Sequence, residues 1–132
     1  MSIEAHEERE LLRLASEVRE RAYAPFSRFR VGAAVLTESG GVHHGCNVEN
    51  ASYGLTICAE RAAVCAAVAA EGPAMRLRAV AVTCGEDGDC SPCGACRQVI
   101  AEFGAGTPVY MLDRRGVRVA PIGELLPLTF RL

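Results

Sequence analysis

Two cysteine-bearing segments, far apart in the sequence, place the strongest constraint on how this chain can fold. Cys58-Ala59-Glu60 opens a stretch rich in Ala, Val and Cys, residues 58–70, that is predicted to be a buried helix. Pro92-Cys93-Gly94-Ala95-Cys96 opens a second predicted helix, residues 92–103. Helix N-termini stabilise thiolate anions, and the spacing of Cys93 and Cys96 lets two thiolates bind one metal. We therefore expect two helix N-termini to meet around a metal ion.

These three cysteines predict a catalytic zinc site. Zinc prefers four tetrahedral ligands, so Cys58, Cys93 and Cys96 leave one position for water. Binding lowers the pKa of that water from about 15.7 to about 7, and Glu60 is close enough to exchange protons with it. This is the H-x-E…P-C-x-x-C pattern of zinc deaminases, with Cys58 in place of the histidine. The alternative is a closed four-cysteine site that uses Cys84 or Cys90 as its fourth ligand.

The composition is that of a globular protein, and the length suits a single domain over residues 1–132. A net charge of −2 and a pI of about 5.9 argue against a nucleic-acid polymer as partner and leave a small-molecule substrate open. No apolar run reaches the roughly 20 residues of a membrane span, and residues 1–10 lack a signal-peptide pattern, so a cytoplasmic location is expected. An odd number of cysteines favours metal binding over disulfides. Cys65 and Cys84 lie in apolar runs and are expected to be buried.

Hydrophobic periodicity predicts the order α-β-β-α-β-α-β-β-α. Strands that alternate with helices favour a mixed sheet with helices on both faces. The expected fold is therefore α/β, a three-layer α/β/α sandwich with a five-stranded mixed sheet. The predicted helices are residues 3–23, 58–70, 92–103 and 122–126, and the predicted strands are residues 30–37, 42–47, 77–84, 109–112 and 117–120. Pro25 is expected to end the first helix.

Several stretches together resemble the small homotetrameric cytidine deaminases along nearly the whole chain. They are Tyr23-Ala24-Pro25-Phe26-Ser27, Phe29-Arg30-Val31-Gly32-Ala33-Ala34, Gly45-Cys46-Asn47-Val48-Glu49-Asn50-Ala51, Cys58-Ala59-Glu60-Arg61, Ser91-Pro92-Cys93-Gly94-Ala95-Cys96-Arg97-Gln98 and Leu125-Leu126-Pro127. The resemblance implies one Zn²⁺ per subunit, held by Cys58, Cys93 and Cys96, and a homotetramer whose subunits share their sites. It also implies the family reaction, the hydrolytic deamination of cytidine and 2′-deoxycytidine in pyrimidine salvage, in which zinc-bound hydroxide attacks C4 and ammonia leaves.

The resemblance also implies roles for individual residues. Glu60 would carry protons to N3 and then to the leaving amine. Asn47 and Glu49 match the pair that hydrogen-bonds the ribose 3′-hydroxyl, and Phe29 matches a ring that packs on the pyrimidine. Ala59 would orient the substrate through its backbone N–H. Phe130 would reach the site of a neighbouring subunit, and Tyr53 would lie at a contact between subunits. Arg61 would lie beside the zinc-binding sulfurs.

Arg61 also has a physical argument of its own. Zinc with three thiolates carries a net negative charge, which a guanidinium donating to the sulfurs would offset.

Two departures from the family pattern stand out. Phe26 occupies a position where tyrosine is common, and Cys90 is not part of the pattern.

Three other readings stay open at this point. A deaminase of the blasticidin-S type shares the P-C-G-x-C-R-Q loop, although Asn47, Glu49 and Arg61 favour cytidine. A polynucleotide deaminase is opposed by the acidic charge balance. A non-enzymatic, zinc-stabilised interaction module would need a fourth protein ligand and would not need Glu60.

Overall fold

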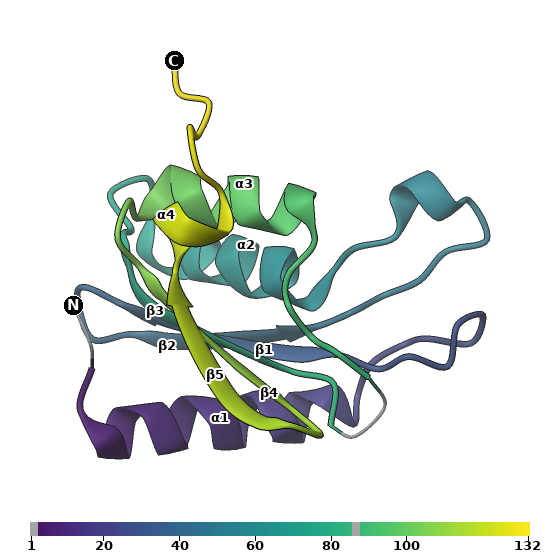
Figure 1. The fold of residues 1–132 in the computed structure, drawn as a ribbon. Helices are drawn as coiled ribbons and strands as arrows, with labels where there is room; N and C mark the ends of the chain where they lie inside the picture. Colours follow the sequence, from purple (N-terminus) through teal and green to yellow (C-terminus); the bar gives the residue numbers. More distant parts are fainter. Residues whose placement is uncertain (1–2, 86–87) are drawn as a thin grey trace.

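Five strands form one mixed sheet between two layers of helices in the computed structural model, which describes residues 3–85 and 88–132 (Figure 1). The strand order is β2-β1-β3-β4-β5; β3 and β4 run parallel and the other neighbours are antiparallel. The strands are β1 (Gly32–Thr37), β2 (Val42–Cys46), β3 (Leu77–Thr83), β4 (Pro108–Asp113) and β5 (Gly116–Pro121). The helices are α1 (Ala5–Arg19), α2 (Ala59–Glu71), α3 (Gly94–Phe103), α4 (Ile122–Leu125) and the 3-10 helix η1 (Tyr53–Leu55). The predicted three-layer α/β/α fold with its five-stranded mixed sheet is confirmed.

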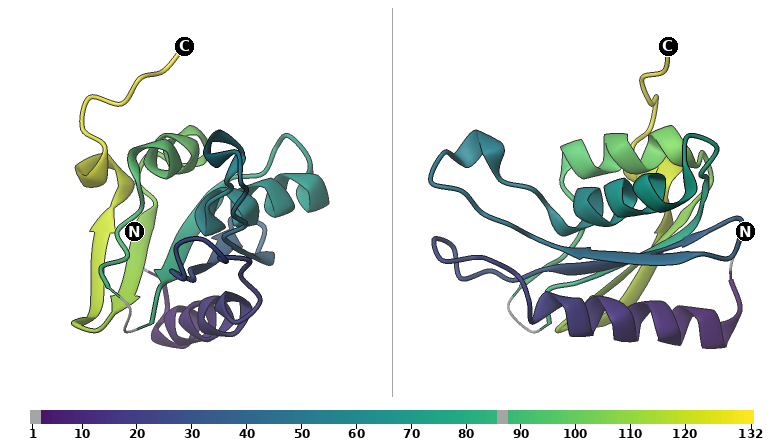
Figure 2. Two further views of the ribbon diagram at one scale, coloured as in Figure 1. Left: turned by 90° about the vertical axis from the view of Figure 1, so that its right-hand side faces the viewer. Right: turned by 180° about the vertical axis from the view of Figure 1, so that it is seen from behind.

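The central strands of the sheet are buried on both faces, which explains their continuous apolar runs. Helix α1 covers one face, and α2, α3 and α4 lie over the other (Figures 1 and 2). Every residue of β1 is buried, and so is all of β3 except Arg78. Strands covered on both sides need apolar residues at successive positions. One core cluster lies on the α1 side and a larger one on the α2 and α3 side.

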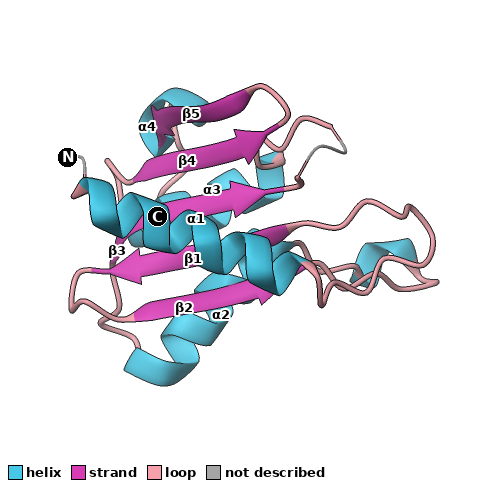
Figure 3. Cartoon of the chain, turned by 90° about the horizontal axis from the view of Figure 1, so that it is seen from below, coloured by secondary structure: helices cyan, strands magenta, loops and turns pink. Residues whose placement is uncertain are grey.

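Two glycines set how closely the helices approach the sheet. A Cβ on Gly32 would lie 2.0 Å from the backbone oxygen of Ala15 in α1, and a Cβ on Gly45 would lie 2.6 Å from the backbone nitrogen of Ala63 in α2. Any larger residue would force the helix away from its strand. Seen from below the sheet, α1 crosses the strands near β1 (Figure 3). These contacts fix the start of α2 relative to the sheet edge.

The prediction that the first helix runs to Tyr23 is wrong. Helix α1 ends at Arg19, well before Pro25, and the chain leaves it in a tight turn. The backbone of Tyr23 instead pairs with the segment after β2, donating to the oxygen of Asn47 (3.0 Å) and accepting from the N–H of Glu49 (2.8 Å). These long-range hydrogen bonds replace those that a longer helix would have made.

Two expectations about the helices on the other face also need correction. Pro92 lies before α3, because the helix begins at Gly94 with Cys93 as its N-cap. Cys65 is exposed, since α2 buries only one side although its residues 62–70 are all apolar. Cys84 is buried as expected. Helix α2 therefore presents an exposed apolar side.

Two loops project together from one end of the sheet as an arm formed by residues 20–31 and 47–57 (Figure 2). Isolated bridges join Tyr23 to Val48 and Val48 to Ile57. The rings of Phe26 and Tyr53 pack edge to face, with centroids 6.2 Å apart. No helix in the described part of the chain is long and apolar enough to cross a membrane.

Candidate metal centre and active site

The N-termini of α2 and α3 bring three sulfur atoms together. Cys58 is the N-cap of α2, Cys93 is the N-cap of α3, and Cys96 lies in the first turn of α3. Their Sγ atoms all lie within 4.8 Å of one another. Zinc with Zn–S bonds of about 2.3 Å needs sulfurs about 3.8 Å apart, so this cluster can close on the ion with little movement. The predicted meeting of two helix N-termini is confirmed.

The cluster leaves a coordination position free. Among residues 3–85 and 88–132, the group that could hold a metal contains these three cysteines and no fourth ligand. The thiol of Cys84 donates to the oxygen of Gly88 (3.2 Å), and that of Cys90 donates to the oxygen of Leu112 (3.2 Å). Neither of the candidate fourth cysteines belongs to the cluster, which therefore fits an open zinc site better than a closed one.

The surroundings of Cys58 favour its thiolate. A hydrogen bond from Cys96 and, after it, one from Arg61 lower the pKa of Cys58 to about 5 against the effect of burial. Arg61 Nη2 lies 3.3 Å from Cys58 Sγ. Because Cys96 donates its own proton to Cys58, the pKa of Cys96 is raised. A negative sulfur beside a fixed guanidinium is the donor chemistry that a divalent zinc ion requires.

The side chain of Glu60, in the first turn of α2, lies beside the sulfur cluster and is 5% exposed. Burial, and to a smaller extent the Cys58 thiolate, raises its pKa to about 7. A bound cation would shift this pKa in the opposite direction. A carboxyl group that titrates near neutrality can both accept and release a proton during one reaction.

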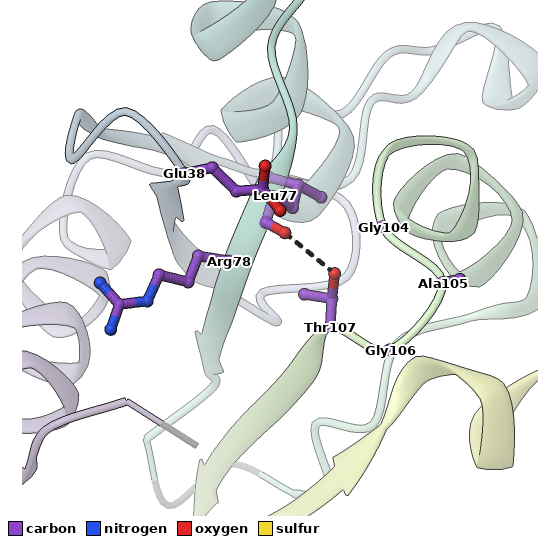
Figure 4. A pocket seen from close by; sticks show the side chains of 7 residues that line it. All are labelled: Glu38, Leu77, Arg78, Gly104, Ala105, Gly106 and Thr107. Carbon is purple, nitrogen blue, oxygen red and sulfur yellow. Dashed lines mark hydrogen bonds between the residues drawn. The ribbon is translucent and has the colours of Figure 1, made fainter. Parts of the chain in front are cut away.

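A cavity of about 200 Å³ opens over this cluster. Its walls are Phe29, Val31, Asn47, Thr56, Cys58, Ala59, Glu60, Asp89, Cys90, Ser91 and Cys93. It lies beside the carboxyl end of β3, where ligands of α/β sheets commonly bind. A larger cavity of about 520 Å³ lies at the opposite end of β3, around Leu77 and Thr107, whose hydroxyl donates to the oxygen of Leu77 (Figure 4). It holds none of the cysteines, so the chemistry is assigned to the smaller cavity.

Comparison with known proteins decides the family. The model named "Cytidine and deoxycytidylate deaminase zinc-binding region" matches residues 5–112. The chain belongs to the cytidine and deoxycytidylate deaminase family. Its cofactor is one zinc ion per subunit, for which the sulfur cluster is the ligand set that the described residues offer.

Relatives in this family match over most of their length. The chain is 47% identical to a cytidine deaminase of Sporosarcina psychrophila, over 91% of this chain and 88% of that protein. It is 48% identical to one of Mycobacterium tuberculosis, over 89% and 85% respectively. A crystal structure of cytidine deaminase from Burkholderia pseudomallei superposes with a TM-score of 0.85 at 47% identity and covers 97% of this chain and 100% of that one.

Most of the residues expected from the family resemblance line the site. Phe29, Asn47 and Ala59 share the cavity with Glu60. Glu49 lies in the adjoining hollow with Phe26, Ser27 and Tyr53, and Thr56 lines both. Phe130 is not among them, since the C-terminal tail carries it, 69% exposed, away from this chain's own cavity.

Asn47 and Glu49 also hold the backbone of the arm. Asn47 Oδ1 accepts from the N–H of Val31 (2.8 Å), and its Nδ2 donates to the oxygen of Phe29 (2.8 Å). Glu49 accepts from the N–H groups of Phe26 (2.9 Å) and Ser27 (3.1 Å), and also from the Ser27 hydroxyl. These bonds fix the ring of Phe29 at the cavity wall, a structural task that the sequence did not indicate.

Sequence reasoning did not single out five wall residues, Val31, Thr56, Asp89, Cys90 and Ser91, as substrate contacts. Val31 and Ser91 lie inside recognised segments, and Thr56, Asp89 and Cys90 lie one or two residues before one, so proximity to these segments is the signal that the sequence offers. Contacts with residues distant in sequence hold Asp89 and Cys90 against β4 and the turn that follows it.

Proposed function

We propose that the protein converts cytidine and 2′-deoxycytidine to uridine and 2′-deoxyuridine by hydrolytic deamination, with release of ammonia. The observation that carries this proposal is the juxtaposition of three converging sulfurs with the buried Glu60 in one cavity. The named relatives, which match along most of their length, are cytidine deaminases. The expected reaction class and the geometry of the site therefore agree.

Cys58, Cys93 and Cys96 would hold the zinc ion. When bound, zinc supplies a water activated for attack at neutral pH. Glu60 would take one proton from the activated water and deliver it to N3 of the pyrimidine. It would then take a second proton, from the hydroxyl added at C4, and deliver it to the leaving amine. Arg61, bonded to Cys58, would offset the negative charge of the sulfurs.

The remaining residues would bind and orient the nucleoside. Phe29 offers a ring for packing on the pyrimidine. The N–H of Ala59, in the first turn of α2, has no partner within its own helix and can donate to the substrate. Asn47 and Glu49 would contact the ribose 3′-hydroxyl with the acceptor and donor capacity that their bonds to the arm leave over.

We further propose a homotetramer of single-domain chains in which a neighbour's tail completes each site. Support comes from apolar side chains that the isolated chain leaves exposed on the arm and tail: Tyr53, Leu55, Leu128 and Phe130. The exposed side of α2 around Cys65 is a further candidate contact. Free thiols at all seven cysteines fit a reducing compartment such as the cytoplasm.

A panel of substrates tests this function. The purified zinc protein is incubated with cytidine, 2′-deoxycytidine, blasticidin S and a cytosine-containing single-stranded DNA, and ammonia release is measured. The two cytosine nucleosides are expected to turn over, because the cavity of about 200 Å³ fits one nucleoside and its described wall residues include no basic group. Preferential turnover of blasticidin S or of the single strand would contradict the proposal.

A further inference from the structure

A buried carboxylate at the end of β4 has no part in the reaction described above. The side chain of Asp113 is 0% exposed. It accepts hydrogen bonds from the N–H of Arg115 (2.9 Å) and from Arg118 Nη2 (2.9 Å). Burying a charge is unfavourable unless its oxygens are well partnered. The placement of this carboxylate therefore calls for a structural or functional reason.

Asp113 faces the loop that leads to the zinc ligand Cys93. Arg115, which also lies 3.8 Å from Asp113, forms an ion pair with Asp89 in that loop at 3.2 Å. The backbone N–H of Arg115, then Arg118 and the backbone N–H of Cys90, hold the pKa of Asp113 below its usual range. The Asp89–Arg115 ion pair thus joins the loop to the hairpin, and the buried carboxylate holds the backbone of Arg115 in place.

The thiol of Cys90 strengthens the same attachment. It donates to the oxygen of Leu112 in β4 (3.2 Å) and lies 3.6 Å from the oxygen of Val82 in β3. Residues 89 and 90 both line the cavity, and Cys93 follows only three positions later. The loop is therefore fixed to the sheet a few residues before Cys93, the first zinc ligand that follows it.

Cys93 depends on this loop more than Cys96 does. Cys96 is buried within α3, whereas Cys93 is an exposed N-cap in extended conformation at the point where loop meets helix. Ligands held in place before the metal binds release it more slowly than ligands on a mobile segment.

We propose that Asp113 is a positioning residue, which fixes residues 88–92 against β4 and so holds Cys93 in place for zinc. This rests on the proposed assignment of Cys58, Cys93 and Cys96 as zinc ligands. The competing explanation is that Asp113 only stabilises the β4–β5 hairpin through Arg118. That explanation predicts a lower unfolding temperature with no change in zinc release from the folded protein.

The test follows zinc release from the folded holoenzyme to a chromophoric chelator, beside thermal unfolding. Asp113→Ala is expected to release zinc about 10- to 100-fold faster than the wild type, the range seen when partners outside the ligand set are lost. Asp113→Asn retains an oxygen of the same shape that can accept from the Arg115 N–H. Its release rate should therefore lie much closer to that of the wild type.

Two arginines of the same turn provide the second variant and the control. Arg115→Gln removes the side-chain link between Asp89 and Asp113 at a position that is 51% exposed, so the fold should survive even if Asp113→Ala does not fold. Faster release from Arg115→Gln supports the proposal, and Arg114→Gln, on an exposed neighbour, should release zinc as the wild type does.

Wild-type release rates from both Arg115→Gln and a folded Asp113→Ala protein would overturn the positioning role, and if Asp113→Ala does not fold, a wild-type rate from Arg115→Gln alone would do so. A wild-type protein that never binds zinc would instead refute the proposed function on which this inference rests. The two failures are therefore distinguishable.

Discussion

Replacing Glu60 with glutamine is expected to lower kcat for cytidine by about 10²- to 10⁴-fold, the range that general acid–base catalysis contributes. The amide has nearly the same shape as the carboxyl group but cannot accept and return a proton at neutral pH. Glu60 is not among the cysteine ligands, so zinc should stay bound. The measurement is steady-state deamination of cytidine together with zinc content and thermal unfolding of the same preparation.

A matched control is Glu102→Gln, which makes the same chemical change on an exposed position of α3. It should leave kcat, zinc content and unfolding temperature at their wild-type values. If Glu60→Gln retained more than about a tenth of the wild-type kcat, a loss smaller than acid–base catalysis accounts for, Glu60 would not be the proton carrier.

Replacing Cys96 with serine is expected to remove both zinc and activity. Cys96 is fully buried in the first turn of α3, and serine fits its space but offers a neutral hydroxyl instead of a thiolate. With two sulfurs left, the site cannot hold the ion firmly, so zinc content should fall from one per subunit towards zero. Elemental analysis after gel filtration gives the zinc content, and the cytidine assay gives the activity.

Cys65→Ser serves as the control for Cys96, because Cys65 is exposed on α2 and lies outside the sulfur cluster. It should retain zinc and activity. A Cys96→Ser protein that is folded and keeps a full complement of zinc would show that the ion is held elsewhere.

The core of this fold could be predicted because its signals are local. Apolar runs marked β1 and β3, and the cysteine segments marked the starts of two helices whose N-caps are Cys58 and Cys93. A helix start depends on a few adjacent residues. The metal cluster therefore followed from two short stretches of sequence.

What could not be predicted depends on contacts between distant segments. Helix α1 ends early because Tyr23 pairs with the segment around Val48. The exposure of Cys65 depends on which side of the apolar stretch 62–70 of α2 meets the sheet. Asp89 in the zinc-binding loop pairs with Arg115 of the β4–β5 hairpin, a contact that no local pattern encodes.

The central claim is that a zinc ion held by three cysteines, with Glu60 beside it, deaminates cytidine. The most direct measurement is the absorbance change as the purified protein converts cytidine to uridine, recorded before and after zinc removal by a strong chelator. We predict conversion by the zinc protein, loss of conversion after chelation, and recovery when zinc alone is added back. Absence of conversion by fully zinc-loaded protein, or undiminished conversion once the zinc is gone, would contradict the account.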